Sequence, residues 1–181
     1  MPIAPEYYTA DMVRTLPDDG QRYEVVYGEL LVTPSPAVDH QHIVLELGAR
    51  LRDYCNLHGV GRPFVSPADI SWGQDILVQP DVFVVPREEA REGVWTAVRT
   101  LLLVAEVLSP STARHDRFQK RKLYQSHDVA TLWLVDTERK IVEVWTPEAT
   151  FPAVERERAT WHPVGAAEPL VIPLVELFAL A

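Results

Sequence analysis

Two acidic residues lie inside apolar segments, where a charge is costly. Glu106 interrupts LLLVAEVLS (101–109), and Asp81 interrupts ILVQPDVFVV (76–85) directly after Pro80, where the strand is expected to be an edge, a bulge or a bend. A carboxylate in a buried strand must be paired, or its pKa must shift. A hard divalent cation would provide that pairing, because Mg²⁺ commonly takes one or two carboxylates and keeps several waters. The two acids therefore predict a metal site; the alternative for each is an ordinary partnered or strand-end carboxyl.

A lysine on the next helix is predicted to point towards these acids. With Asp116 at 0° and about 100° per residue, Lys120 lies near 40°, Leu123 near 340° and Tyr124 near 80°, whereas Lys122 lies near 240°. We expect Lys120 to face the sheet and Lys122 to face water. Near a metal, Lys120 would orient or activate a water and stabilise developing negative charge. The alternative is a lysine that only packs its aliphatic stem on apolar surface.

The linker Ser109-Pro110-Ser111-Thr112 joins the Glu106 strand to this helix. Ser111 or Thr112 is expected to cap the helix, whose free N–H groups would then lie just past Glu106 and favour a phosphate. The same helix concentrates basic residues at positions 114, 117, 120, 121 and 122. They predict phosphate contacts, with a solvated helix face as the alternative.

The remaining pattern predicts the elements that position these residues. We expect a short helix capped by Thr9, a hairpin over RYEVVYGELLVTP pivoting at Gly28, and a long helix over residues 37–58. The other expected elements are strands at 64–72, 76–85, 101–109, 131–136 and 140–146, a helix at 113–127, and a tail of one or two strands closed by the helical turn LVELFAL. Continuous apolar strands bracketed by helices indicate an α/β domain with a sheet covered on both faces.

Composition narrows the class of protein. The chain of 181 residues fits a single domain over residues 1–181. Its net charge of −9 disfavours a protein that coats nucleic acid, although a local basic cluster can act alone. It has no apolar run long enough for a membrane span, no secretory signal, and a single cysteine, Cys55, so we expect a cytoplasmic protein without a membrane. Motifs for serine hydrolases, P-loop NTPases, Rossmann enzymes and zincins are absent.

Six segments in series resemble the Uma2 family (DUF820) of restriction-endonuclease-like proteins in the PD-(D/E)XK nuclease superfamily. They are RYEVVYGEL (22–30), SPAVDHQHIV (35–44), VQPDVFVV (78–85), AEVLSPST (105–112), DRFQKRKLY (116–124) and TLWLVD (131–136), and they span about residues 20–146. The superfamily pattern places its lysine two residues after the second acid, but Leu108 stands there. In Uma2-like sequences the lysine lies on the following helix, in a pattern that Asp116, Lys120 and Tyr124 match.

The resemblance implies a restriction-endonuclease-like core, here a mixed central sheet flanked by helices with an added N-terminal helix and β-hairpin. It implies Mg²⁺-dependent hydrolysis of phosphodiester bonds in DNA, with Mn²⁺ as the substitute metal. Asp81 and Glu106 match the metal-binding and catalytic acids, and Lys120 matches the catalytic lysine. The expected accessory residues are Glu24, Glu29, His40, Asp116 and Tyr124, with Ser111, Thr112 and Arg117 as phosphate contacts. For His40 a hydrogen-bonding role near the helix start is an equal alternative.

Three classes of function remain open. The first is a metal-dependent endonuclease, to which the charge of −9 is the main objection. The second is a catalytically silent nuclease fold that binds nucleic acid or protein without metal. The third is a structural dimer, for which the buried acids would be a liability without a function. A homodimer or higher homo-oligomer suits a nuclease that cuts both strands, and Trp95, Trp145 and Trp161 are equally suited to an interface or to the core.

Overall fold

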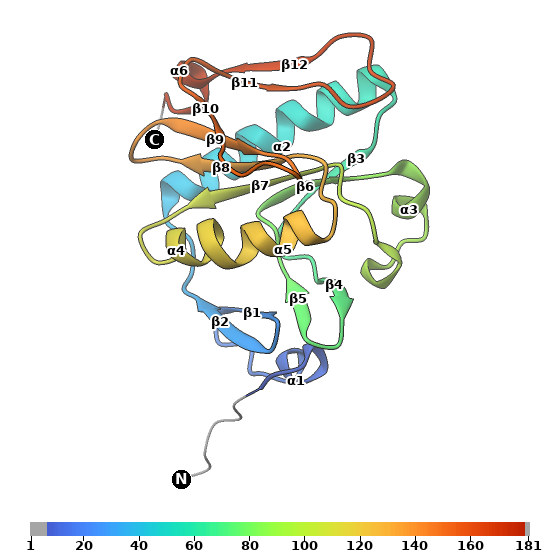
Figure 1. Ribbon diagram of the computed structural model, residues 1–181, viewed down its shortest axis with the longest axis vertical. Coiled ribbons are helices and arrows are strands. Elements are labelled where there is room, and N and C mark those ends of the chain that lie inside the picture. The colour runs from blue at the N-terminus through green and yellow to red at the C-terminus, as the bar shows by residue number, and fades with distance from the viewer. Residues whose placement is uncertain (1–6, 180–181) are drawn as a thin grey trace.

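The computed structural model describes residues 7–179, and its centre is a mixed six-stranded sheet in the order β10-β9-β8-β7-β6-β3 (Figure 1). Its strands are β3 (Arg62–Val65), β6 (Val82–Val85), β7 (Leu103–Leu108), β8 (Leu132–Asp136), β9 (Ile141–Trp145) and β10 (Ala153–Glu155). The pair β7–β8 is parallel and its neighbours are antiparallel. The helical crossover between β7 and β8 covers one face of the sheet, as a parallel pair requires.

The other face of the central sheet packs against α2 (Val38–His58), the C-terminal hairpin β11 (Arg158–Trp161) and β12 (Leu170–Pro173), and α6 (Leu174–Leu177). Ile43, Leu47 and Leu51 of α2 are fully buried there. Gly59 ends α2 with φ of 72°, in the left-handed conformation that glycine adopts without strain. The long helix, the hairpin at Gly28 and the closing helical turn were all predicted, and the structure confirms them.

A second sheet, in the order β2-β1-β5-β4, lies on the same side of the central sheet as the crossover helix (Figure 1). It consists of β1 (Arg22–Val26), β2 (Glu29–Thr33), β4 (Ile70–Gly73) and β5 (Ile76–Val78). Its outer face is covered by α1 (Ala10–Arg14), which Thr9 caps by accepting a hydrogen bond from the Met12 N–H at 3.2 Å. The added N-terminal helix and hairpin are thus part of a complete second layer.

Two strand predictions were wrong in extent. Residues 64–72 form β3 and β4 in different sheets, separated by a cis Ser66–Pro67 bond, and residues 76–85 divide at Pro80 into β5 and β6. Pro80 has no N–H to donate to a ladder, so the chain bends there and passes from one sheet to the other. Between β6 and β7 lie α3 (Arg87–Arg91) and the 3-10 turn η1 (Trp95–Ala97).

The tryptophans belong mainly to the core. Trp145 and Trp161 are buried, and the half-buried Trp95 packs edge-on against Phe64 and Phe83. Within residues 7–179, no helix combines the length and the apolar character that crossing a membrane requires.

Candidate nuclease site

Asp81 and Glu106 face each other on neighbouring strands of the central sheet. Val82 of β6 pairs with Ala105 of β7 in an antiparallel register, and one step further along this register places Asp81 opposite Glu106. Strand side chains alternate between faces, so both acids share the face that carries the crossover helix. Each residue is only 1% exposed. The prediction that both acids are buried is therefore confirmed.

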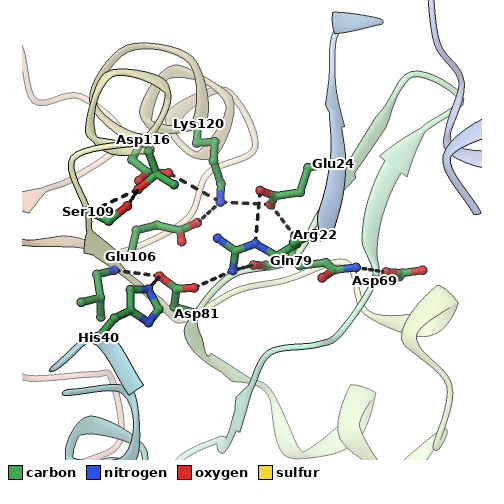
Figure 2. Close-up of polar contacts among 12 residues, drawn as sticks. Arg22, Glu24, His40, Asp69, Gln79, Asp81, Glu106, Ser109, Asp116 and Lys120 are labelled. Atoms are coloured by element: carbon green, nitrogen blue, oxygen red, sulfur yellow. Dashed lines mark hydrogen bonds and ion pairs between the residues drawn. The ribbon is translucent and has the colours of Figure 1, made fainter. Parts of the chain in front are cut away.

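Lys120 reaches this pair from the crossover helix (Figure 2). Its Nζ lies 2.7 Å from Glu106 Oε1 and 3.0 Å from Glu24 Oε1. The residue is 1% exposed, whereas Lys122 is exposed on the opposite side of the helix. The helical phasing thus chose the correct lysine.

The crossover helix is irregular at the point where it meets the site. It begins as α4 (Ala113–His115), widens into the π-helix η2 (Asp116–Lys120), and continues as α5 (Arg121–Ser126). Asp116 Oδ1 lies 3.7 Å from Lys120 Nζ, and the Tyr124 hydroxyl donates a hydrogen bond to Glu106 Oε1 at 2.5 Å. Single-turn π-helices occur frequently at functional sites, and this one brings three side chains spaced four residues apart onto the acids.

Asp81 is held by three donors. Arg22 Nη1 lies 2.6 Å from Oδ1, and Oδ2 accepts from the Val107 N–H at 2.9 Å and contacts His40 Nε2 at 3.1 Å. His40 lies in the first turn of α2, so it is both a residue of the helix start and a residue of the site. The two roles that the sequence left open are therefore compatible.

The two hairpin glutamates are separated by the structure. Glu24 is buried and its Oε1 accepts a hydrogen bond from the Gln79 N–H at 2.7 Å, directly beside Lys120. Glu29 is exposed and accepts from the Gln119 side chain, outside the cluster. The difference follows from strand geometry, because Glu24 lies on the inner face of β1 whereas Glu29 begins β2 beside the turn at Gly28.

Burial and charge set the protonation of the cluster. Burial raises the pKa of Glu106 to about 8, with Asp81, Asp116 and Glu24 adding to the effect and Lys120 opposing it. Burial acts in the same direction on Asp81, but His40 and Arg22 outweigh it and hold the pKa of that carboxyl well below its usual range. Burial disfavours the charge on Lys120, yet the nearby Glu106 and Glu24 raise its pKa. Lys120 is therefore an ammonium ion at neutral pH.

The cluster holds more carboxyl groups than permanent cations. Its carboxyls are those of Glu24, Asp81, Glu106 and Asp116, and its permanent cations are Arg22 and Lys120. Glu106 Oε2 is buried and has no hydrogen-bond partner. An unpartnered carboxylate oxygen in an acidic, buried site is suited to a cation.

The two carboxyl groups of Asp81 and Glu106 are a donor set that is compatible with magnesium. Within residues 7–179, no group of three or more His, Cys, Asp or Glu side chains is arranged to hold an ion. Mg²⁺ binds through as few as one or two carboxylates and retains several waters. Asp81 and Glu106 are the residues that would hold it.

A cleft of about 700 Å³ opens above the cluster, between the second sheet, the start of α2 and the 109–112 loop. Arg22, His40 and Gln79 line it, whereas the acids and Lys120 lie behind them. The side chain of Arg22 is 17% exposed and that of Asp81 is 2% exposed. Arg22 and His40 therefore form the boundary between the open cleft and the buried acids.

The predicted phosphate contacts divide in the same way. Ser111 and Thr112 line the cleft, whereas Arg117 binds Asp136 at 2.6 Å and Glu143 at 3.0 Å and fixes the helix to β8 and β9. The capping prediction needs correction, because neither Ser111 nor Thr112 makes a side-chain cap. Thr112 holds the cap position, but its Oγ1 accepts from the Ser109 N–H at 3.3 Å and its hydroxyl also bonds Asp116.

Sequence reasoning missed two residues of the site, Arg22 and Gln79. Arg22 precedes Glu24 by two residues, so in a strand both side chains lie on one face. That spacing was available in the sequence and would have identified the arginine. Gln79 donates hydrogen bonds to Glu24 through its backbone N–H and to Asp69 through its side chain. No pattern in the sequence predicts either contact.

Comparison with known proteins agrees with this geometry. No curated protein matches the sequence. Among solved structures, the chain is similar to a protein described as "a putative nuclease belonging to DUF820 from Anabaena variabilis ATCC 29413". The TM-score is 0.78 at 23% identity, covering 94% of this chain and 97% of that chain, which establishes a shared fold. The family model Uma2, described as "Putative restriction endonuclease", matches residues 9–173. This chain is therefore a member of the Uma2 family.

Proposed function

We propose that this protein is a Mg²⁺-dependent endonuclease that hydrolyses phosphodiester bonds in DNA. One observation carries the proposal: Asp81, Glu106 and Lys120 converge beneath a cleft, with one buried Glu106 oxygen left without a partner. Membership of a family described as "Putative restriction endonuclease" supports the same reaction. In this proposal Mn²⁺ substitutes for Mg²⁺, and the protein acts in the cytoplasm as a homo-oligomer whose twofold symmetry suits cleavage of both strands.

Asp81 and Glu106 hold the metal and Lys120 acts on the water. Bound magnesium supplies charge that polarises the phosphoryl group. Lys120 is an ammonium ion, so it cannot accept a proton; it donates hydrogen bonds that place the attacking water and stabilise negative charge on the phosphoryl oxygens. The hydroxyl of Ser111 at the cleft wall donates a hydrogen bond to the neighbouring phosphate.

The reaction forms one bond and breaks another. The water oxygen bonds to phosphorus, one ester P–O bond breaks, and the proton lost by the water is matched by a proton gained at the leaving oxygen. The products are a phosphomonoester and an alcohol. No redox partner or second substrate is needed.

A catalytically silent binding module is the second candidate, and one observation favours it. Arg22, His40 and Lys120 already compensate Asp81 and Glu106 in the absence of metal. A protein of this kind would bind nucleic acid or protein equally well with and without Mg²⁺. The same experiment separates the two candidates.

The test compares wild type with Asp81→Asn, which keeps the shape of the side chain and removes its charge. The matched control is Asp69→Asn, because Asp69 lies at the cleft but contacts Gln79 and Arg14 rather than Arg22 and His40. Calorimetry measures Mg²⁺ binding, and supercoiled plasmid and single-stranded DNA are assayed with Mg²⁺, Mn²⁺ or EDTA. We expect metal-dependent cleavage by wild type and Asp69→Asn only. Equal DNA binding with and without metal, and no cleavage by any variant, would establish the binding module instead.

A further inference from the structure

Arg22 connects the cleft to the buried acids. Its guanidinium lines the cleft, its Nη1 lies 2.6 Å from Asp81 Oδ1, and the same nitrogen donates to the Gln79 carbonyl at 3.3 Å (Figure 2). The nearby carboxylates of Glu24 and Asp81 outweigh burial and keep this arginine charged. Arg22 is therefore a permanent cation resting on one of the two acids expected to hold a metal.

Each oxygen of Asp81 already has a polar partner that an incoming ion would have to face. Oδ1 is occupied by Arg22, and Oδ2 is occupied by His40 and the Val107 N–H. A magnesium ion approaches its oxygen ligands to about 2.0–2.1 Å, much closer than the guanidinium does. A magnesium ion and a guanidinium bound to the same carboxylate oxygen lie within a few ångströms of each other, and in this buried site they repel strongly. Metal binding at Oδ1 therefore favours movement of Arg22 away from Asp81.

The surroundings of Arg22 give the displaced guanidinium one open direction. Its Nε has no hydrogen-bond partner, and its remaining acidic neighbour, Glu24 Oε2, lies 3.7 Å away without a hydrogen bond. The cleft is the open side. A guanidinium is planar, remains charged, and binds phosphate through two parallel hydrogen bonds, so a phosphate in the cleft would receive it.

We propose that Arg22 is a substrate-binding residue with two positions: it neutralises Asp81 when the metal is absent, and it turns into the cleft to bind a DNA phosphate when the metal displaces it. This inference rests on the proposed nuclease function. It adds a residue and an order of events, in which metal binds first and completes the phosphate site.

The test compares wild type with Arg22→Gln and Arg22→Lys, using MgCl₂ alone as the first probe. Removing the competing cation should tighten Mg²⁺ binding by Arg22→Gln about tenfold, a size typical of coupling between two ligands. Without metal, this variant should melt below wild type because Asp81 loses its partner. Its melting temperature should then rise more than that of wild type when Mg²⁺ is added, since tighter binding stabilises the folded state more.

DNA provides the second readout. At saturating Mg²⁺, Arg22→Gln should raise KM for plasmid cleavage about tenfold, because a charged, bidentate phosphate contact is lost. Arg22→Lys keeps the charge without the fork, so its metal affinity should stay near that of wild type while its KM rises. Arg14→Gln is the matched control: Arg14 lines the same cleft but pairs with Asp11, and its loss should leave Mg²⁺ affinity unchanged.

The outcomes separate this inference from the function on which it rests. If wild type binds Mg²⁺ and cleaves DNA but Arg22→Gln gains no more affinity than Arg14→Gln, the inference fails alone. If Arg22→Gln binds Mg²⁺ more tightly but its KM for DNA is unchanged, the proposed contact between Arg22 and a phosphate is wrong. If neither wild type nor Arg22→Gln binds Mg²⁺, both proposals fail. If Arg22→Gln folds only when Mg²⁺ is present, displacement is supported; if it never folds, a raised KM for Arg22→Lys at unchanged metal affinity decides in favour.

Discussion

The carboxyl of Glu106 and the ammonium of Lys120 lie 2.7 Å apart and are almost fully removed from water. Such a pair is strongly coupled: desolvation opposes both charges, so each depends on the other. The pair also connects the two halves of the site, because Lys120 contacts Glu24 of the second sheet as well. Changes at this position should therefore affect stability and function together.

Replacing Lys120 by methionine keeps the length of the side chain and removes its charge. We expect a loss of about 3–5 kcal/mol in the free energy of unfolding, because Glu106 and Glu24 are left buried beside an apolar group. DNA cleavage should be abolished. Lys122→Met on the exposed face should change stability by less than about 0.5 kcal/mol and retain cleavage. Urea denaturation and plasmid nicking measure both effects, and equal losses in the two variants would contradict the assignment.

The raised pKa of Glu106 predicts how stability depends on pH. The folded chain holds this proton up to about pH 8, whereas a free glutamate releases it near its ordinary value of 4.5. The stability that the folded state gains by holding this proton is therefore fully present below pH 4.5 and is lost as pH rises towards 8. In Glu106→Gln the free energy of unfolding should fall less steeply between pH 4.5 and 8 than in wild type. Urea unfolding at several pH values in this interval checks it, with Glu29→Gln on the surface as control; an unchanged slope in Glu106→Gln would contradict it.

The site residues found from sequence share a property that the others lack. They are ionisable residues on faces that the hydrophobic pattern predicts to be buried, namely Asp81, Glu106 and Lys120. The sequence alone therefore shows that they are out of place. Arg22 stands at the start of a strand, where an arginine is ordinary. Only the pairing of β1 with β5 brings it near Asp81, and such a contact between residues 59 positions apart depends on the tertiary fold.

At the scale of elements, the π-helix η2 sets the phase of the crossover helix. It keeps Asp116 and Lys120 buried on one face while the exposed Phe118 points outward. A regular α-helix turns 100° per residue, so removing one residue from the wide turn would rotate everything on one side of it. The geometry of the lysine therefore depends on an irregularity of the backbone.

Deleting Phe118 tests that dependence. The helix should persist as a regular α-helix, with far-UV circular dichroism near that of wild type, but Lys120 and Tyr124 can no longer meet the acids together. Cleavage should fall by about 10²-fold or more, as expected for a catalytic group displaced by an ångström or so. Phe118→Ala keeps the register and should leave both measurements near wild type. Full activity in the deletion variant would show that the π-turn is dispensable.

The sequence predicted the type and order of most elements better than their partners. The continuous apolar run of Val82, Phe83, Val84 and Val85 indicates a strand buried on both faces, whichever strand it pairs with. It contains no information on whether the neighbour is β3, β5 or β7. The division of residues 64–85 between two sheets depends on the bend at Pro80 and on long-range pairing, so the continuous strands expected there were wrong.

At the scale of the whole molecule, little of the positive charge faces the cleft. Among the described residues, Arg14, Arg22 and His40 are the cleft-lining side chains that can carry it. Arg117 forms ion pairs with Asp136 and Glu143, and Arg121 stacks on Trp145 with its guanidinium 4.4 Å from the ring centroid. The chain as a whole carries a net charge of −9. These two basic side chains of the crossover helix thus fix that helix to the sheet rather than face the cleft.

DNA binding should consequently depend weakly on salt. With about three phosphates neutralised, the logarithm of the binding constant should fall with a slope of about −3 against the logarithm of salt concentration. Fluorescence anisotropy with labelled DNA over a series of KCl concentrations measures the slope. Arg22→Gln should reduce it by about one unit, and Lys122→Met should leave it unchanged. A slope two or three times steeper would mean that DNA contacts a surface beyond the cleft.

The two outermost strands of the central sheet also affect how copies of this protein meet in solution. An open edge offers unpaired N–H and C=O groups to any neighbouring chain and so invites aggregation. Here one edge strand, β3, has four residues and contains Pro63, and the other, β10, has three residues. Neither provides a long template. Another copy of the chain therefore has little edge to pair with, and the protein should tolerate high concentration without polymerising edge to edge.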